Sequence, residues 1–114
     1  LNFIGVGYAT GDANYSLIYN DGSGTTTKTD LGSNFPTSTG TQAWLHVSLW
    51  APFGGGSVSY LIKNLTNGSI SSGTLSTNIP SGSTALGAYV LTNCLSSGAG
   101  ATFAISNIVQ ESTL

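Results

Sequence analysis

The sequence predicts an all-β domain, built as an antiparallel two-sheet β-sandwich of about eight strands, most often a jelly roll. Charged residues make up only 5% of the 114 residues, whereas the exposed faces of helices usually rely on Glu and Lys. Short stretches alternate apolar and polar residues, turn-forming residues separate them, and no stretch has a helical period. The length suits one modest core, so we expect a single domain over residues 1–114.

Three strands are expected near the start of the chain. Asn2 to Tyr8 alternates until Thr10-Gly11-Asp12 breaks the pattern, and Tyr15 to Tyr19 follows. The run Asn20-Asp21-Gly22-Ser23-Gly24 predicts a chain reversal, because Asn, Asp and Gly tolerate a positive φ. Thr25 to Leu31 is rich in β-branched Thr and completes a predicted hairpin.

The clearest strand lies in the middle of the chain, from Ala43 to Ala51. Val58 to Lys63 and Ser69 to Thr77 follow as expected antiparallel neighbours, joined by the hairpin turn Leu65-Thr66-Asn67-Gly68. Gly, Pro and Ser then mark loops before the last strands. These last two strands are expected over Ala85 to Leu91 and Thr102 to Val109.

The strand from Ala43 to Ala51 also carries the best candidate for function. Its alternation separates two sets of side chains: Leu45, Val47 and Leu49 on one face, and Trp44, His46, Ser48 and Trp50 on the other. The two tryptophans, about 20 Å apart along an extended strand, have three open interpretations: half of a core, a subunit interface, or platforms for stacking on sugar rings. We expect His46 to be a neutral imidazole packed between them. A strand that is apolar on both faces is expected to be buried on both, which favours assembly.

The residue inventory argues against catalysis. Glycoside hydrolysis needs two facing carboxyl groups. The only acids are Asp12, Asp21, Asp30 and Glu111. We expect these acids mainly to accept hydrogen bonds in turns. No Gly-x-Ser-x-Gly motif accompanies the only histidine, His46, and one cysteine with one histidine cannot complete a zinc site. We therefore expect no catalytic site, no metal and no cofactor.

Several classes of partner are also disfavoured. Two lysines and a net charge of -2 provide no basic surface for nucleic acid or anionic lipid. The apolar runs are too short for a membrane-spanning helix. The single cysteine, Cys94, cannot form an internal disulfide and leaves the redox compartment open. We expect neither nucleic-acid binding nor membrane insertion.

A set of strand and turn segments carries a family resemblance. These segments are Ile4 to Asn14, Tyr19 to Lys28, Asp30 to Pro36, Trp44 to Pro52, Val58 to Tyr60 and Gly73 to Ser81. Together they cover nearly the whole chain, which resembles C-terminal regions of tailed-bacteriophage tail fibre, tailspike and related virion proteins. The resemblance implies a lectin-like (concanavalin-type) or jelly-roll sandwich with a role in host-surface attachment or trimer formation. It further implies that this chain, which begins at Leu1, is the C-terminal part of a longer fibre or spike protein.

We therefore expect a non-catalytic phage tail module, located on the virion and extracellular, that binds host-cell surface polysaccharide and forms a homotrimer. The residues expected to bind the carbohydrate are Trp44, Trp50, His46, Tyr15, Tyr19 and Asp21. Two alternatives stay open. One is a purely structural module that folds or trimerises a longer virion protein, and the other is a small glycosidase that uses two of the four acids.

Overall fold

The computed structural model describes residues 1–37, 44–52 and 54–84, all within the first of two units into which the chain divides, Leu1–Thr84. The described residues form six β-strands and no helix, so the all-β prediction is confirmed. The strands expected over 85–91 and 102–109 lie outside the described residues, as do Cys94 and Glu111.

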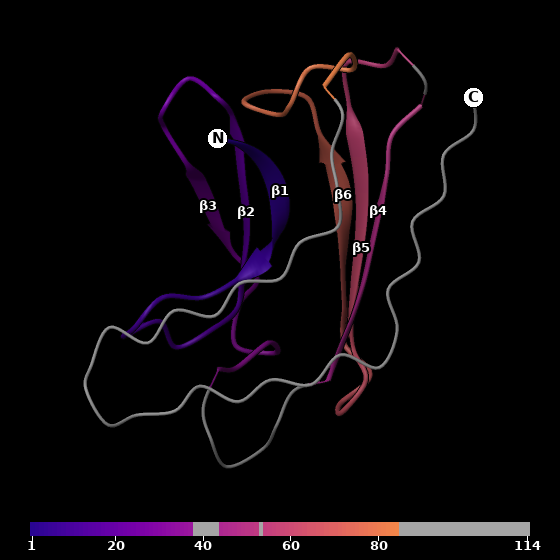
Figure 1. The fold of residues 1–114 in the computed structure, drawn as a ribbon. Helices are drawn as coiled ribbons and strands as arrows, with labels where there is room; N and C mark the ends of the chain where they lie inside the picture. The colour runs from indigo at the N-terminus through magenta and orange to yellow at the C-terminus, as the bar shows by residue number, and fades with distance from the viewer. Residues whose placement is uncertain (38–43, 53, 85–114) are drawn as a thin grey trace. The chain divides into compact units, whose positions relative to one another are not determined.

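The first sheet is an antiparallel meander with its second strand in the centre (Figure 1). Its strands are β1 (Asn2–Gly7), β2 (Ser16–Asp21) and β3 (Thr27–Asp30). The predicted reversal between β2 and β3 is confirmed, because Gly22 and Gly24 have φ values of 91° and 101°. Asn20 and Asp21 stabilise this turn: their side-chain oxygens accept hydrogen bonds from the N–H groups of Gly22 and Ser23, at 2.6 and 2.9 Å.

The second sheet is also an antiparallel meander, of β4 (Leu45–Trp50), β5 (Val58–Asn64) and β6 (Ile70–Leu75), with β5 in the centre. The hairpin turn predicted between β5 and β6 is confirmed: Gly68 has a φ of 79° and donates its N–H to the Asn64 carbonyl at 2.8 Å. The register places Val47 opposite Ile62, and Ile62 opposite Ser71.

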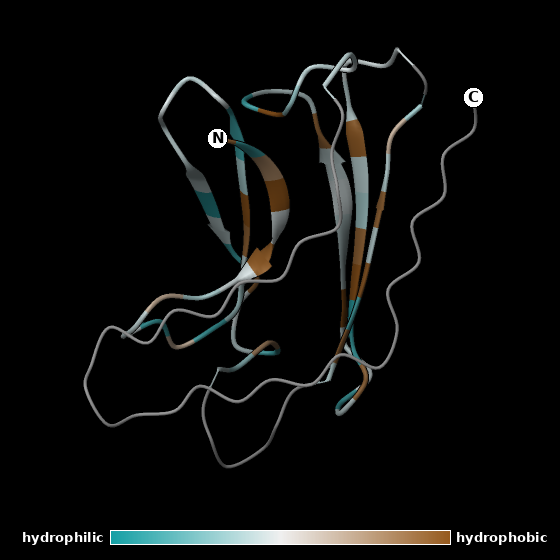
Figure 2. Ribbon diagram, viewed as in Figure 1, coloured by the Kyte–Doolittle hydropathy of each residue, from teal (hydrophilic) through white to brown (hydrophobic). Residues whose placement is uncertain are grey.

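The hydrophobic core takes side chains from both sheets. Leu17 and Tyr19 of β2, Ile62 of β5 and Phe35 after β3 are each 8% exposed or less. Partly buried side chains pack against these four: Ile4, Val6, Tyr15, Leu31, Leu45, Tyr60, Leu75 and Ile79. Figure 2 shows the apolar bands on β1, β2, β4 and β5, whereas β3 and most of β6 are teal or white. The two sheets therefore share one core, whose burial is the main driving force for folding.

Two asparagine side chains add polar links across the chain. Asn64, at the end of β5, is only 1% exposed; its Nδ2 donates to the Asn34 carbonyl at 2.8 Å and its Oδ1 accepts the Thr66 N–H at 3.0 Å. Asn78 Nδ2 donates to Thr25 O at 3.0 Å and to Thr27 Oγ1 at 2.6 Å. Across the described ranges, no buried side-chain nitrogen or oxygen lacks a hydrogen-bond partner.

Candidate functional site

The outward side of the β4–β5–β6 sheet, which we call the tryptophan face, is the first candidate site. Strand alternation puts Ile62 in the core, so Leu61 and Lys63 lie on the opposite side of β5. The register then places His46 opposite Lys63, and Lys63 opposite Ile70, on that same side. The tryptophan face is centred on Trp44, His46, Trp50, Leu61, Lys63 and Ile70.

The ends of the tryptophan face are marked by its two indole rings. Trp44 precedes β4 and extends its pairing, because its carbonyl accepts the Leu65 N–H at 2.7 Å. Trp44 and Trp50 are 47% and 64% exposed, and His46 between them is exposed too. Hydroxyl side chains occupy most of the remaining outward positions: Ser48, Ser59, Ser72 and Thr74.

This exposure corrects two interpretations drawn from the sequence. The imidazole of His46 is not packed between the tryptophans, and Trp44 and Trp50 are not half of a core. Val47 and Leu49, on the inward side of β4, are also 41% and 36% exposed in the single chain. The reason is position: β4 lies at the edge of its sheet in the described chain, and Leu45 alone of its side chains packs against the core.

Two tyrosines predicted to bind carbohydrate do not belong to the tryptophan face: Tyr15 immediately precedes β2, and Tyr19 lies within this strand. Tyr19 is 8% exposed and belongs to the core. Tyr15 is partly buried and packs its ring edge-on against Tyr8, with the ring centroids 5.2 Å apart. Burial raises the pKa of the Tyr15 phenol. Neither ring is a freely exposed platform.

Asp21, the last predicted carbohydrate residue, ends β2 at the turn into β3. Hydrogen bonds from the Ser23 hydroxyl and from the Ser23 N–H lower the pKa of its carboxyl group. The structure thus gathers Trp44, His46 and Trp50 on one face and places Asp21 on a different sheet.

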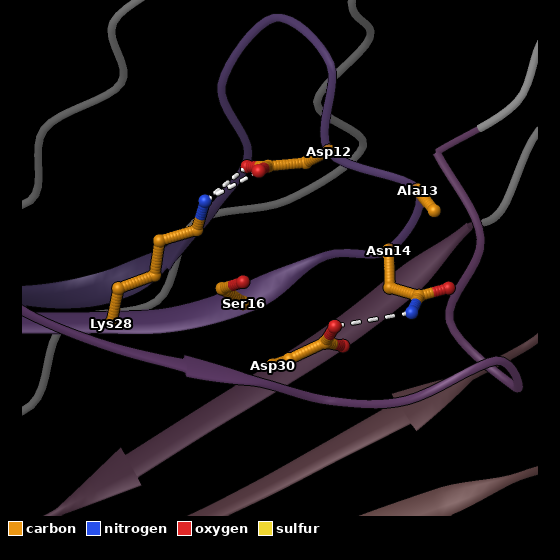
Figure 3. Close-up of a pocket in the computed structure, with 6 residues that line it drawn as sticks. All are labelled: Asp12, Ala13, Asn14, Ser16, Lys28 and Asp30. Carbon is orange, nitrogen blue, oxygen red and sulfur yellow. Dashed lines mark hydrogen bonds and ion pairs between the residues drawn. The ribbon is translucent and has the colours of Figure 1, made fainter.

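A polar pocket of about 230 Å³ is the second candidate site, and it lies where the connection between β1 and β2 meets β3 (Figure 3). Its lining residues are Asp12, Ala13, Asn14, Ser16, Lys28 and Asp30. Lys28 Nζ lies 2.5 Å from both carboxylate oxygens of Asp12, and Asn14 Nδ2 donates to Asp30 Oδ2 at 3.2 Å. Lys28 and Asp12 therefore form an ion pair, whereas Asp30 accepts its hydrogen bond from a neutral amide.

The chemistry of the polar pocket follows from these pairings. The Ala9 N–H donates to Asp12 Oδ2 at 2.6 Å, and this bond together with Lys28 lowers the pKa of the Asp12 carboxyl group. Glycoside hydrolysis instead needs one carboxyl group with a raised pKa to act as the general acid. Asp30 accepts the Gly32 N–H at 2.7 Å. The predicted turn role is confirmed for Asp12, Asp21 and Asp30, each of which accepts a backbone N–H.

Within 1–37, 44–52 and 54–84, no three His, Cys, Asp or Glu side chains form a group that could hold a metal ion. The same residues contain no helix long and apolar enough to cross a membrane. No family model, curated protein or solved structure matches the chain.

Sequence reasoning did not single out two features of these sites. The register of the second sheet adds Lys63, Leu61 and Ile70 to the tryptophan face. The hairpin turn at 65–68 and the alternation of β5 were the sequence features that could have predicted this. The pairing of Lys28 with Asp12 had no such signal, because these residues are 16 positions apart and meet only through the pairing of β2 with β3.

Proposed function

We propose that the protein is a non-catalytic attachment module of a phage tail fibre or tailspike, which binds host-cell surface polysaccharide through the tryptophan face. The observation that carries this proposal is the pair of exposed indole rings: Trp50 ends β4, and Trp44 immediately precedes this strand. Alternation puts both rings on the same side. Exposed aromatic rings stack on flat apolar surfaces such as sugar rings, and they lose little conformational entropy when they do.

The spacing of the two rings favours a polymer over a single sugar. Trp50 lies six positions after Trp44, which corresponds to about 20 Å along an extended chain. One sugar ring cannot contact both platforms at this distance, whereas an extended polysaccharide lying along β4 can. The serine and threonine hydroxyls of the same face supply hydrogen-bond donors and acceptors between the platforms.

The proposal includes the architecture and setting implied by the family resemblance. We take the two three-stranded sheets as parts of an eight-stranded sandwich of the jelly-roll or lectin-like type. In this proposal the module is extracellular, is carried on the virion and works as a homotrimer. Few charged residues and many small hydroxyl residues suit such a surface.

A purely structural trimerisation module is the second candidate, and the inward side of β4 favours it. Val47 and Leu49 leave 41% and 36% of their surface exposed on a strand at the edge of the described sheet. Exposed apolar side chains next to an unpaired strand edge are a template for pairing with another chain. Because this surface lies opposite the tryptophan face, assembly and polysaccharide binding are compatible.

The test of attachment is binding to an array of host-surface polysaccharides, with Trp44→Ala, Trp50→Ala and the double variant. We expect saturable binding to at least one polymer, and a loss of about tenfold in affinity for each tryptophan removed, as for aromatic hot spots. Tyr8→Ala is the matched control, because Tyr8 is an exposed aromatic residue (58%) just after β1, outside the tryptophan face, and its loss should leave affinity unchanged. Absence of binding, or equal binding by the double variant, would reject attachment through this face.

A further inference from the structure

The charges of the described residues are divided unevenly between the two sheets. The acids Asp12, Asp21 and Asp30 all belong to the first sheet or its connections, and so does Lys28, which pairs with Asp12. The second sheet, over 44–52 and 54–84, contains no carboxylate and one lysine, Lys63. In a chain with a net charge of -2, the tryptophan face is therefore locally positive.

Lys63 is exposed, and it forms no ion pair or hydrogen bond with any residue that the structure describes. Its register partner on β4 is His46, so their Cβ atoms are about 5 Å apart on the same face. Trp44 is two residues from His46 along the chain, which makes it a diagonal neighbour of Lys63 at about 7–8 Å. An ammonium group and an imidazole thus lie beside one of the two aromatic platforms.

This arrangement has a consequence for a ligand that lies along β4. A polymer stacked on Trp44 passes within reach of the Lys63 ammonium group, and stacking removes water from around the contact. An ionic hydrogen bond becomes stronger as water is excluded, and no nearby acid of the described chain competes for Lys63. A neutral polymer would offer this ammonium group only hydroxyl oxygens, which are weaker acceptors than a carboxylate.

We infer that the tryptophan face recognises an acidic polysaccharide, one whose repeating unit carries a carboxylate, and that Lys63 binds that carboxylate while Trp44 stacks on an adjacent sugar ring. This inference rests on the proposed attachment function and names its ligand class. Lys63 supplies charge selectivity, the two tryptophans supply the sugar platforms, and His46 contributes a further polar contact beside the carboxylate.

The experiment measures the affinity of the purified full chain for a panel of neutral and uronic-acid-containing bacterial polysaccharides. The best-bound acidic polymer is compared with its carboxyl-reduced form, which keeps the sugar rings and loses the charge. We expect carboxyl reduction and Lys63→Gln each to weaken binding about tenfold, as for one ionic hydrogen bond. Combining them should cost little more than either alone, because both remove the same contact.

Two matched variants separate charge from structure. Lys63→Arg keeps the positive charge and should retain most of the affinity for the acidic polymer. Lys28→Gln removes the other lysine, whose partner is Asp12 in the first sheet, and should leave binding unchanged. Raising the salt concentration should weaken binding by the unsubstituted chain more than binding by Lys63→Gln.

The outcomes distinguish the two proposals. Preference for neutral polymers, equal binding of the carboxyl-reduced form, or unchanged binding by Lys63→Gln would overturn the acidic ligand and leave the attachment function standing. Failure to bind any polymer, neutral or acidic, would overturn both.

Discussion

At the scale of single residues, the aspartates of the described chain stabilise turns through local hydrogen bonds. Asp12, Asp21 and Asp30 each accept a backbone N–H from a residue two or three positions away, which stabilises a turn. Asp12 alone adds an ion pair, with Lys28. The contacts of Asp12 and Asp21 lower the pKa of their carboxyl groups, and therefore connect the stability of these two turns to pH.

Acid should weaken the fold through Asp12. Its folded-state pKa lies below the ordinary value of 3.8, so its contribution to stability is present above that pH and is lost as pH falls through the folded pKa. We expect Asp12→Asn to unfold at a lower denaturant concentration than the unsubstituted chain at pH 7. We expect this difference to be smaller at about pH 3, because below 3.8 the unfolded chain takes up the proton more readily than the folded chain does. Chemical denaturation at the two pH values measures this.

Lys63→Gln is the control for that measurement, because Lys63 has no ion pair in the part of the chain that the structure describes. Its effect on the denaturation midpoint should be small at both pH values. A difference between Asp12→Asn and the unsubstituted chain that stays constant from pH 7 to low pH would contradict the assigned role of Asp12.

At the scale of the elements, one buried asparagine holds the end of β5. Asn64 is 1% exposed, and its amide connects the strand end both to the Asn34 carbonyl and to the turn that leads into β6. Asn67 lies in that turn and donates to the same Asn34 carbonyl at 2.9 Å, but its side chain is exposed. The two side chains thus make similar bonds in very different surroundings.

Asn64→Ala should lower the free energy of unfolding by about 1–3 kcal/mol, because it removes two hydrogen bonds inside a buried site. Asn67→Ala should cost less, since water replaces the lost bonds of an exposed amide. Thermal and chemical denaturation of both variants measure the difference. Equal losses for the two variants would show that burial does not decide the contribution of Asn64.

At the scale of the whole molecule, the second sheet presents two different surfaces. Its outward side carries the tryptophans, hydroxyls and Lys63, while the inward side of β4 leaves Val47 and Leu49 partly exposed. We assign polysaccharide binding to the first surface and assembly to the second. A single edge strand would then serve both parts of the proposed function.

Assembly predicts a homotrimer in solution, with about three times the 11.5 kDa mass of the chain by light scattering at micromolar concentration. Val47→Asp should shift the distribution to smaller species, because a carboxylate is costly to bury in an apolar interface. Leu61→Asp is the matched control: Leu61 is 40% exposed on the tryptophan face, so its substitution should leave the oligomeric state unchanged. A monomer for the unsubstituted chain would contradict the trimer.

Much of the local structure followed from the sequence. Alternation, turn residues and the lack of a helical period predicted all six described strands, and every predicted end lies within two residues of the observed one. The same alternation placed Trp44, His46 and Trp50 on one side of their strand. These features are local, because side chains of a β-strand alternate with a period of two whatever the strand packs against.

The sequence by itself therefore determined the strands, their turns and which side chains share a face. Only the tertiary structure decided which of those faces is buried: Tyr19 lies in the core and Trp50 is 64% exposed, although both are aromatic residues in strands. It also decided that Lys28 meets Asp12 while Lys63 stays next to the tryptophans. The physical reason is that burial and long-range pairing depend on how the two sheets share one core, and alternation within a strand is the same for either face.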